Sequence, residues 1–166
     1  NEEKNLAECI ASVACADEVL VVVDSATTDK TEAIARAHGA TVLVHEYVNS
    51  AAQTNWAIPQ AKHPWVLIVD ADERATPELQ TDVATVLQND GPADGYRIRR
   101  INHFAGQRIT GCGWQRDEVL RLFRRDRGRY EDKHVHADII AKDDQPFKVE
   151  RLNGAFLHYT FDNFGQ

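Results

Sequence analysis

The sequence predicts an α/β fold with a mostly parallel central sheet, helices on both of its faces, and a smaller second half of mixed and antiparallel strands. Over the first ninety residues, segments with helical spacing of apolar residues alternate with short apolar runs of strand length. Such alternation is typical of a parallel sheet covered by crossover helices. After residue 95 the chain becomes rich in arginine and glycine. We therefore expect one domain, with halves at residues 1–94 and 95–166.

Composition excludes several classes of protein. With 166 residues, 43% of them hydrophobic, the chain is long enough for one domain with a real core. The formal net charge of −7 disfavours nucleic acid as a partner, and no apolar run approaches the length of a membrane span. The three cysteines have no metal-like spacing, which points to a reducing compartment. We expect a cytoplasmic protein.

The first half reads as alternating helices and strands. Apolar residues at i, i+3, i+4 and i+7 predict a helix over residues 6–13, and a valine-rich strand over 18–23 follows it and ends at Asp24. Asp29 with Glu32 resembles a capping box for the next helix. The remaining elements of this half are a strand at 41–44, a helix that Asn49-Ser50 can cap and that Pro59 ends or kinks, and an apolar strand at 65–69. Thr76 and Pro77 then open a helix with Leu79, Val83, Val86 and Leu87 inward.

The second half is predicted less regularly. Tyr96, Ile98 and Ile101 lie on an arginine-rich strand, and residues 119–123 alternate as another strand. Residues 129–136 are polar and are expected to be irregular. Residues 147–149 and 155–159 are expected to form two antiparallel strands.

The strongest chemical signal is Asp70-Ala71-Asp72-Glu73, directly after the apolar run 65–69. Side chains alternate along an extended chain, so Asp70 and Asp72 can point to the same side. Two carboxylates that close repel unless a cation lies between them, and oxygen ligands suit Mg²⁺ or Mn²⁺. The alternative is that one aspartate caps the following helix while Glu73 is solvated.

A sugar nucleotide would account for this pair together with two other features. Asp24 ends an earlier strand, so it is expected at the same carboxyl edge of the sheet, where ligands of parallel sheets bind. Ten arginines lie between residues 97 and 129, and arginines such as Arg121 can pair with phosphate oxygens. A diphosphate also needs a divalent cation.

Several segments resemble family 2 glycosyltransferases, which have the GT-A fold: residues 1–3, 16–25, 28–31 and 65–73. Gly113-Trp114 and residues 120–125 are similar to the subgroup that adds glucose to the heptose of the lipopolysaccharide inner core. The resemblance implies an inverting enzyme that moves a sugar from a UDP-sugar donor to a saccharide or lipid-linked acceptor. It would work at the inner face of the membrane with at most peripheral association.

The resemblance also implies residue roles. Glu3 and Asp24 would contact the uridine of the donor in the first half's nucleotide-sugar site, and Asp70 and Asp72 match the D-x-D motif, with Asp72 as the direct metal ligand and Asp70 also on the donor side. Arg121, on an alternating strand, is a separate candidate for contact with the donor phosphate or the acceptor, and the alternative is a surface salt bridge. The second half would carry the acceptor site and the general base, for which Glu131-Asp132 is the matching pair and Asp132 the base. Trp114 and His136 are candidates for acceptor contact, and His136 and His158 for a metal contact.

Two departures from the family pattern stand out. Subgroup members commonly carry V-H-E where this chain has Val135-His136-Ala137, which bears on the assignment of the base. The family also begins with a strand before Asn1-Glu2-Glu3 and continues beyond His158, so a fragment is expected.

Other classes of protein also place a D-x-D pair after an apolar strand. In phosphatases of the haloacid dehalogenase type the first Asp is a nucleophile and the second an acid/base. A non-catalytic nucleotide-sugar-binding or receiver-like module is the third possibility.

Overall fold

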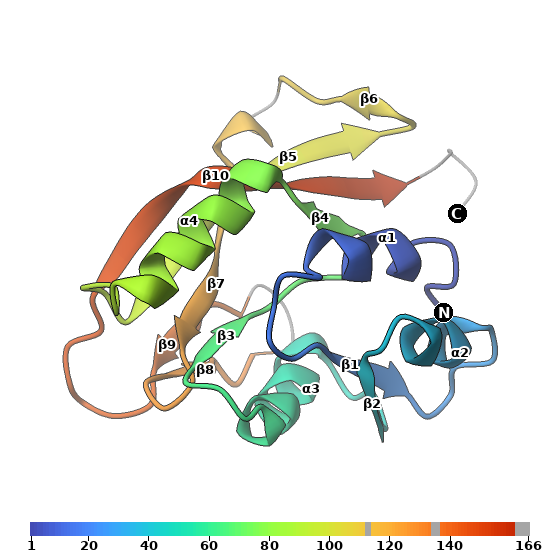
Figure 1. The fold of residues 1–166 in the computed structure, drawn as a ribbon, viewed down its shortest axis with the longest axis horizontal. Coiled ribbons are helices and arrows are strands. Elements are labelled where there is room, and N and C mark those ends of the chain that lie inside the picture. Colours follow the sequence, from blue (N-terminus) through green and yellow to red (C-terminus); the bar gives the residue numbers. More distant parts are fainter. Residues whose placement is uncertain (112–113, 134–136, 162–166) are drawn as a thin grey trace.

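The structure is a computed structural model, and it describes residues 1–111, 114–133 and 137–161 (Figure 1). The first half contains α1 (Leu6–Ser12), β1 (Leu20–Asp24), α2 (Thr31–Ala37), β2 (Thr41–His45), α3 (Ser50–Ala57), the 3₁₀ turn η1 (Ile58–Gln60), β3 (Trp65–Leu67), β4 (Glu73–Ala75) and α4 (Pro77–Gln88). The second half contains β5 (Gly95–Phe104), β6 (Gln107–Arg108), the 3₁₀ turn η2 (Trp114–Arg116), β7 (Glu118–Arg124), β8 (Gly128–Tyr130), β9 (Ile139–Ala141) and β10 (Val149–Phe161).

The strands form three sheets. β1 and β2 pair in parallel. The largest sheet has the order β3-β7-β5-β10-β4, with β6 added beside β5. Within it β5 and β10 are parallel, whereas the other pairs are antiparallel. β8 and β9 form a short antiparallel pair.

β3 and β4 lie at opposite ends of the path through the largest sheet, although only residues 68–72 separate them in sequence. Four strand spacings of about 4.8 Å make roughly 19 Å, close to the limit that so short a segment can span when fully extended. The segment is not fully extended, because the N–H of Glu73 donates to the carbonyl of Asp70 at 2.9 Å. The sheet therefore has to curl, and the acidic segment runs beside residues of β7, β5 and β10, namely Arg121, Arg100 and His158.

Apolar packing holds this arrangement. One buried cluster joins α4 to the curled sheet through Leu79, Ile98, Leu122 and Phe156. A second cluster packs α3 and η1 against β7, β8 and β9, with Phe123 fully buried. A third joins α1 and α2 beside β1 and β2. The helices are thus the covers of the sheets, as the alternating pattern predicts.

Local details differ from the sequence prediction. The two strands expected at 147–149 and 155–159 are one strand, β10, which is parallel to β5 and antiparallel to β4. The expected capping box of Asp29 and Glu32 does not form. Asp29 accepts from the N–H of Thr31, Glu32 pairs with Arg36, and Lys30, the residue before α2, makes no side-chain cap. By contrast, Asn49 and Thr76 cap α3 and α4 as expected.

No helix in the described ranges is both long enough and apolar enough to span a membrane.

Candidate active site

The acidic segment Asp70–Glu73 forms a tight turn rather than the end of an extended strand. β3 ends at Leu67, and the bond from Glu73 to the carbonyl of Asp70 closes the turn. The expectation that strand alternation places Asp70 and Asp72 side by side therefore does not describe the geometry. Asp70 meets a residue of β7, Asp72 meets a residue of β10, and Glu73 lies near residues of both β7 and β5.

Asp70 faces β7. Its carboxylate accepts two hydrogen bonds from the guanidinium of Arg121, through Nη1 at 3.3 Å and through Nη2. The Arg121 side chain is 9% exposed, and its Nη1 also lies 3.2 Å from the hydroxyl of Tyr130. Burial alone would lower the pKa of Arg121, but the charges of Asp70 and Glu73 raise it above its ordinary value. Arg121 thus holds the turn in place and leaves little of its own surface for a ligand.

Glu73 supports the turn from inside the protein. It is fully buried, and its Oε2 accepts from the N–H of Asp70 at 3.0 Å. Its Oε1 lies 3.8 Å from Arg121 and 3.8 Å from Arg100. Burial raises the pKa of Glu73 against the opposing charge of Arg121. The expectation that Glu73 is solvated if an aspartate caps the helix is wrong.

Asp72 faces β10. One of its carboxylate oxygens lies 3.4 Å from Nε2 of His158, and its side chain is 31% exposed. The other ring nitrogen of His158, Nδ1, lies 2.6 Å from Oδ1 of Asn102 on β5. Asn102 in turn donates to Asp117 at 3.0 Å, and Asp117 accepts from Arg100. Asp70 is the more exposed aspartate, at 44%, but both of its oxygens accept from Arg121, whereas Asp72 lies beside His158 at the end of a continuous polar chain.

A divalent cation fits at Asp72 better than at Asp70. Mg²⁺ is commonly held by one or two carboxylates together with substrate phosphates and water. The carboxylate of Asp72 is partly exposed, whereas that of Asp70 is engaged by Arg121. Within the described ranges, no group of three or more His, Cys, Asp or Glu side chains is arranged to hold an ion. A cation at Asp72 would therefore need further oxygen ligands from a substrate or from water.

The two acids predicted for the nucleotide lie at the carboxyl end of β1. Asp24 ends that strand, and its Oδ1 accepts from the N–H groups of Ala26 and Tyr47, both at 3.2 Å. Glu3 is exposed and accepts from the N–H of Lys30 at 3.2 Å in the loop that follows β1. Both carboxylates therefore belong to one loop system beyond the strand end.

Glu131 and Asp132, the two candidates for the general base, follow β8. Asp132 is 83% exposed and lies 3.1 Å from Arg129. Glu131 is 24% exposed and accepts from Lys133 at 2.8 and 2.9 Å and from the N–H of Asp138. The hydrogen bond from Lys133 is the main reason that the pKa of Glu131 lies below its usual range. Asp132 thus has the more accessible carboxylate.

A cavity of about 480 Å³ lies between this region and the acidic turn. α3, β5, β7 and the segment around β8 and β9 surround it, and its walls include Arg97, Arg100, Arg121, Tyr130, Lys133 and Asp138. Arg121 lines this cavity and also pairs with Asp70, and Lys133 and Asp138 in its wall contact Glu131, so the cavity lies beside both regions. It has room for part of a ligand.

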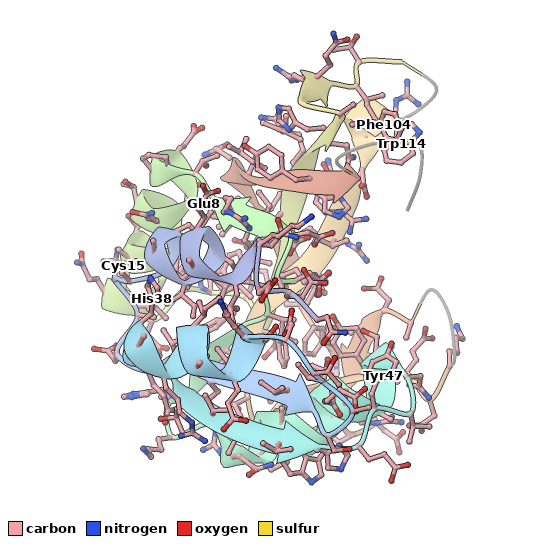
Figure 2. The ribbon with its side chains drawn as sticks, turned by 90° about the vertical axis from the view of Figure 1, so that its right-hand side faces the viewer. Glu8, Cys15, His38, Tyr47, Phe104 and Trp114 are labelled. Carbon is pink, nitrogen blue, oxygen red and sulfur yellow. The ribbon has the colours of Figure 1, made fainter. Side chains whose placement is uncertain are left out.

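Of the two candidates for acceptor contact, the structure describes Trp114 but not His136. Trp114 is 41% exposed, and its carbonyl accepts from Asn102 at 3.5 Å. In Figure 2 it lies with Phe104 at the end of the molecule that β5 and β6 form, far from Tyr47. His136, like Gly113, lies outside the described residues.

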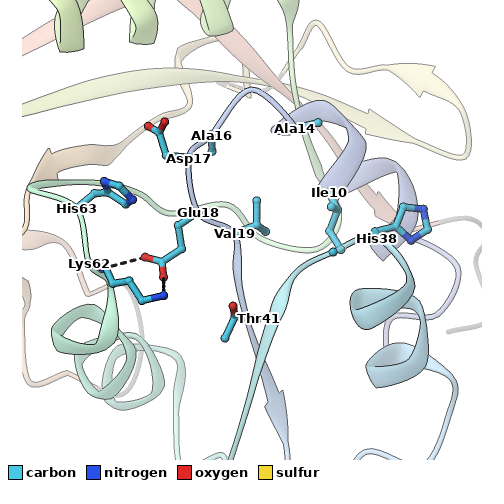
Figure 3. A pocket seen from close by; sticks show the side chains of 11 residues that line it. Ile10, Ala14, Ala16, Asp17, Glu18, Val19, His38, Thr41, Lys62 and His63 are labelled. Carbon is cyan, nitrogen blue, oxygen red and sulfur yellow. Dashed lines mark hydrogen bonds and ion pairs between the residues drawn. The ribbon is translucent and has the colours of Figure 1, made fainter.

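A second cavity, of about 350 Å³, lies at the opposite ends of the strands (Figure 3). Its walls come from the residues just before β1 and β3 and from the start of β2. Across it Lys62 pairs with Glu18, and its N–H donates to the same carboxylate, which lowers the pKa of Glu18. Ligands of such sheets bind at the carboxyl ends of strands, so this cavity is not the candidate site.

Sequence reasoning missed the residues that organise the turn: Glu73, Arg100, Asn102, Asp117 and Tyr130. They are far apart in sequence: Glu73 is on β4, Arg100 and Asn102 are on β5, Asp117 precedes β7, and Tyr130 is on β8, so only the tertiary fold brings them together. Glu73 carries a weak signal, since it continues the acidic motif. The others had none beyond the general richness in arginine.

Comparison with known proteins identifies the family. The model of glycosyl transferase family 2 matches residues 1–141, which is most of the chain. The chain belongs to this family. Family membership gives no support to the alternatives of a dehalogenase-type phosphatase or a phospho-receiver.

Curated relatives of the family cover nearly all of the chain. The lipopolysaccharide core biosynthesis glycosyltransferase LpsC of Rhizobium meliloti is 30% identical over 96% of this chain and 60% of its own length. The uncharacterized glycosyltransferase RT0209 of Rickettsia typhi is 28% identical over 96% of this chain and 57% of its own length. The chain thus spans about three fifths of these relatives.

Solved structures show the same fold. TarS of S. aureus, residues 1–349, superposes with a TM-score of 0.60 at 17% identity, covering 96% of this chain and 57% of that one. Its complex with UDP-GlcNAc gives a TM-score of 0.60 at 18% identity over 99% of this chain and 57% of that one. At this identity the likeness concerns the fold alone, and the predicted GT-A fold is confirmed.

Proposed function

We propose that this chain carries the donor site and catalytic residues of an inverting glycosyltransferase that moves a sugar, with glucose as the first candidate, from a UDP-sugar to a saccharide acceptor. The observation that carries the proposal is the braced acidic turn. Glu73 accepts from the backbone N–H of Asp70 and Arg121 engages the Asp70 carboxylate, while the carboxylate of Asp72 stays partly exposed. A rigid turn with one available carboxylate is suited to a phosphate-bound cation.

The donor lies across the carboxyl ends of the strands in this proposal. Asp24 and Glu3 accept hydrogen bonds from the uridine, and Asp24 is already fixed by two backbone N–H groups. Asp70 contributes to the same site through its partly exposed carboxylate. Asp72 holds Mg²⁺ or Mn²⁺, with Asp70 as a second oxygen ligand if its pairing with Arg121 loosens. When bound, such an ion neutralises the charge that develops on the departing diphosphate.

Asp132 acts as the general base. The acceptor hydroxyl attacks the anomeric carbon from the face opposite to the diphosphate, so the bond to UDP breaks as the new glycosidic bond forms and the configuration inverts. The hydroxyl proton passes to a carboxylate oxygen of Asp132. Arg129 orients that carboxylate at 3.1 Å, and Glu131 holds the adjacent loop through Lys133 and Asp138.

The acceptor in this proposal is a saccharide of the lipopolysaccharide core, free or lipid-linked. The support is the name of the relative LpsC, a lipopolysaccharide core biosynthesis enzyme. The exposed ring of Trp114 offers a surface on which a sugar can stack, and His136 is a second candidate contact. A lipid-linked acceptor would bring the enzyme to the inner face of the cytoplasmic membrane.

The two halves divide the work accordingly. Residues 1–94 supply Glu3, Asp24 and the acidic turn for the donor. Residues 95–166 supply Asp132 and the acceptor contacts, and they also contribute Arg121 to the donor side.

A thermal-shift screen of nucleotide sugars with Mn²⁺ or Mg²⁺ tests the proposal. A ligand at one hundred times its Kd stabilises a protein by about 2.7 kcal/mol, which is roughly 5–10 °C in Tm for a chain of this size. We expect UDP-glucose with Mn²⁺ to raise Tm in this range and GDP-mannose to have little effect. Equal shifts for all nucleotide sugars, or none for UDP-sugars, would contradict the choice of donor.

A further inference from the structure

Asn102 occupies a buried position in the polar chain behind Asp72. It lies on β5 opposite His158 of β10, and it is 1% exposed. Its Oδ1 lies 2.6 Å from Nδ1 of His158, and its Nδ2 lies 3.0 Å from Oδ2 of Asp117. Buried side-chain amides are costly unless their polar atoms are paired. Both contacts are therefore expected to fix the orientation of the side chains of His158 and Asp117.

Asp117 fixes which way the amide points. Arg100 donates two parallel hydrogen bonds to its carboxylate, both at 2.9 Å. Burial alone would raise the pKa of Asp117, but the bonds from Arg100 and Asn102 hold it below its usual value. An ionised carboxylate only accepts hydrogen bonds, so the amide group of Asn102 that faces Asp117 must be the NH₂ donor. The amide oxygen then faces His158.

The amide oxygen in turn fixes the imidazole. A carbonyl oxygen only accepts hydrogen bonds, so Nδ1 of His158 must carry the hydrogen in their 2.6 Å contact. A neutral ring with a protonated Nδ1 has its free lone pair on Nε2, and this nitrogen lies 3.4 Å from Asp72.

We propose that Asn102 is a positioning residue that keeps Nδ1 of His158 protonated and turned toward β5, so that Nε2 faces the space beside Asp72. His158 and Asp72 then present a nitrogen and an oxygen to one point, at which a cation would be held. The hydrogen on Nδ1 follows from the contacts of Asn102, whereas its role in sugar transfer rests on the proposed function.

Nuclear magnetic resonance of ¹⁵N-histidine-labelled protein tests the tautomer directly. Long-range ¹⁵N–¹H correlation distinguishes protonated from unprotonated ring nitrogens, and the His158→Gln variant identifies the signals of His158. We expect a protonated Nδ1 in the wild type, because this nitrogen must donate to the amide oxygen of Asn102. An unprotonated Nδ1 would overturn the proposal.

The Asn102→Leu variant tests the cause. Leucine has a similar size but no acceptor, so His158 should lose the preference for a protonated Nδ1. Gln107→Leu, on the exposed neighbouring strand β6, is the matched control and should leave the spectrum unchanged. Loss of such a supporting bond typically costs 10–100-fold in metal affinity or activity, and we expect a loss of about this size in the apparent Mn²⁺ affinity of the UDP complex.

The outcomes separate the two levels of the proposal. An unchanged tautomer in a folded Asn102→Leu variant, or a changed tautomer with unchanged Mn²⁺ affinity and transfer, would overturn the positioning role. If Asn102→Leu does not fold, the protonation of Nδ1 in the wild-type spectrum still tests the proposal. Failure of the wild type to bind any UDP-sugar would contradict the proposed function but would leave the tautomer result standing.

Discussion

Neighbouring residues of the acidic turn have different roles because their partners lie on different strands. Asp70 is tied to Arg121, and Glu73 is buried between Arg121 and Arg100, whereas Asp72 is accessible beside His158. Taking one partner away from a buried ion pair leaves an uncompensated charge, which is strongly destabilising. Changes at Arg121 or Glu73 therefore test folding more than chemistry, and Asp72 and Asp132 are the informative positions for function.

Asp132→Asn should abolish transfer without affecting donor binding. General base catalysis contributes about 10²–10⁴-fold, so we expect kcat to fall by that factor while the Kd for the UDP-sugar stays the same. Because the side chain is 83% exposed, the stability should change by no more than about 0.5 kcal/mol. Steady-state kinetics and donor titration check this prediction.

Glu131→Gln is the matched control for the base. Its carboxylate is held by Lys133 and Asp138, so we expect a smaller loss of kcat than in Asp132→Asn. If Glu131→Gln removes transfer and Asp132→Asn does not, the base is Glu131.

Asp117→Asn should change how stability depends on pH. Hydrogen bonds from Arg100 and Asn102 keep the pKa of Asp117 below its unfolded value, so its contribution to stability is present above about pH 4 and is lost as the pH falls through the folded pKa. The variant should be about 1.5–3 kcal/mol less stable at pH 7, the range for hydrogen bonds to charged groups.

Urea unfolding at neutral and acid pH measures this effect. The difference between wild type and Asp117→Asn should shrink as the pH is lowered below about 4, because only the wild type loses the ionised partner. A difference that stays constant with pH would show that Asp117 is not ionised in these contacts.

Among the elements, β10 best shows where sequence patterns fail. The break in apolar character between 149 and 155 suggests two strands, but one strand with a register shift between Arg151 and Ala155 continues along β5. Asn153 and Gly154 make this possible, since both of their N–H groups donate to Asp82 of α4. At the register shift, the hydrogen bonds to Asp82 therefore satisfy backbone N–H groups of β10, and local sequence patterns do not reveal this long-range contact.

Gly154→Ala should destabilise this packing. An added Cβ would overlap the backbone N and Cα of Leu79 in α4, which cannot move without shifting the helix. Overpacking of this kind typically costs about 1–3 kcal/mol, and thermal unfolding measures it. Gly111→Ala is the control and should have little effect, because no atom of the described residues beyond its chain neighbours lies within 4 Å of the added Cβ. Equal stability of both variants would contradict the described contact of β10 with α4.

Helix caps and apolar faces, in contrast, were predictable from local sequence. Asn49 and Thr76 accept from the N–H groups of Ala52 and Leu79, as their types and positions indicate. Local chemistry suffices for such contacts, because both partners lie within one turn. Leu87 is an exception: the spacing predicts it inward, but it is 41% exposed because it lies at the edge of the helix face.

At the scale of the whole molecule, the fold class and the position of the acidic motif in the segment that follows a strand were predictable from the sequence. The curl of the largest sheet was not, because it depends on β3 and β4 lying at opposite ends of one strand order. That curl brings Arg121, Arg100 and His158 to the acidic turn. The candidate residues of the motif were therefore predictable, whereas the residues that orient them needed the structure.

The central claim is that Asp72 holds a divalent cation together with the diphosphate of a UDP-sugar. Titration calorimetry of UDP-glucose into the wild type and Asp72→Asn, each with and without Mn²⁺, tests it most directly. We predict that binding to the wild type depends on Mn²⁺ and that Asp72→Asn binds at least about tenfold more weakly, a loss of about 1.4 kcal/mol or more. Metal-independent binding of equal strength in both proteins would contradict the claim.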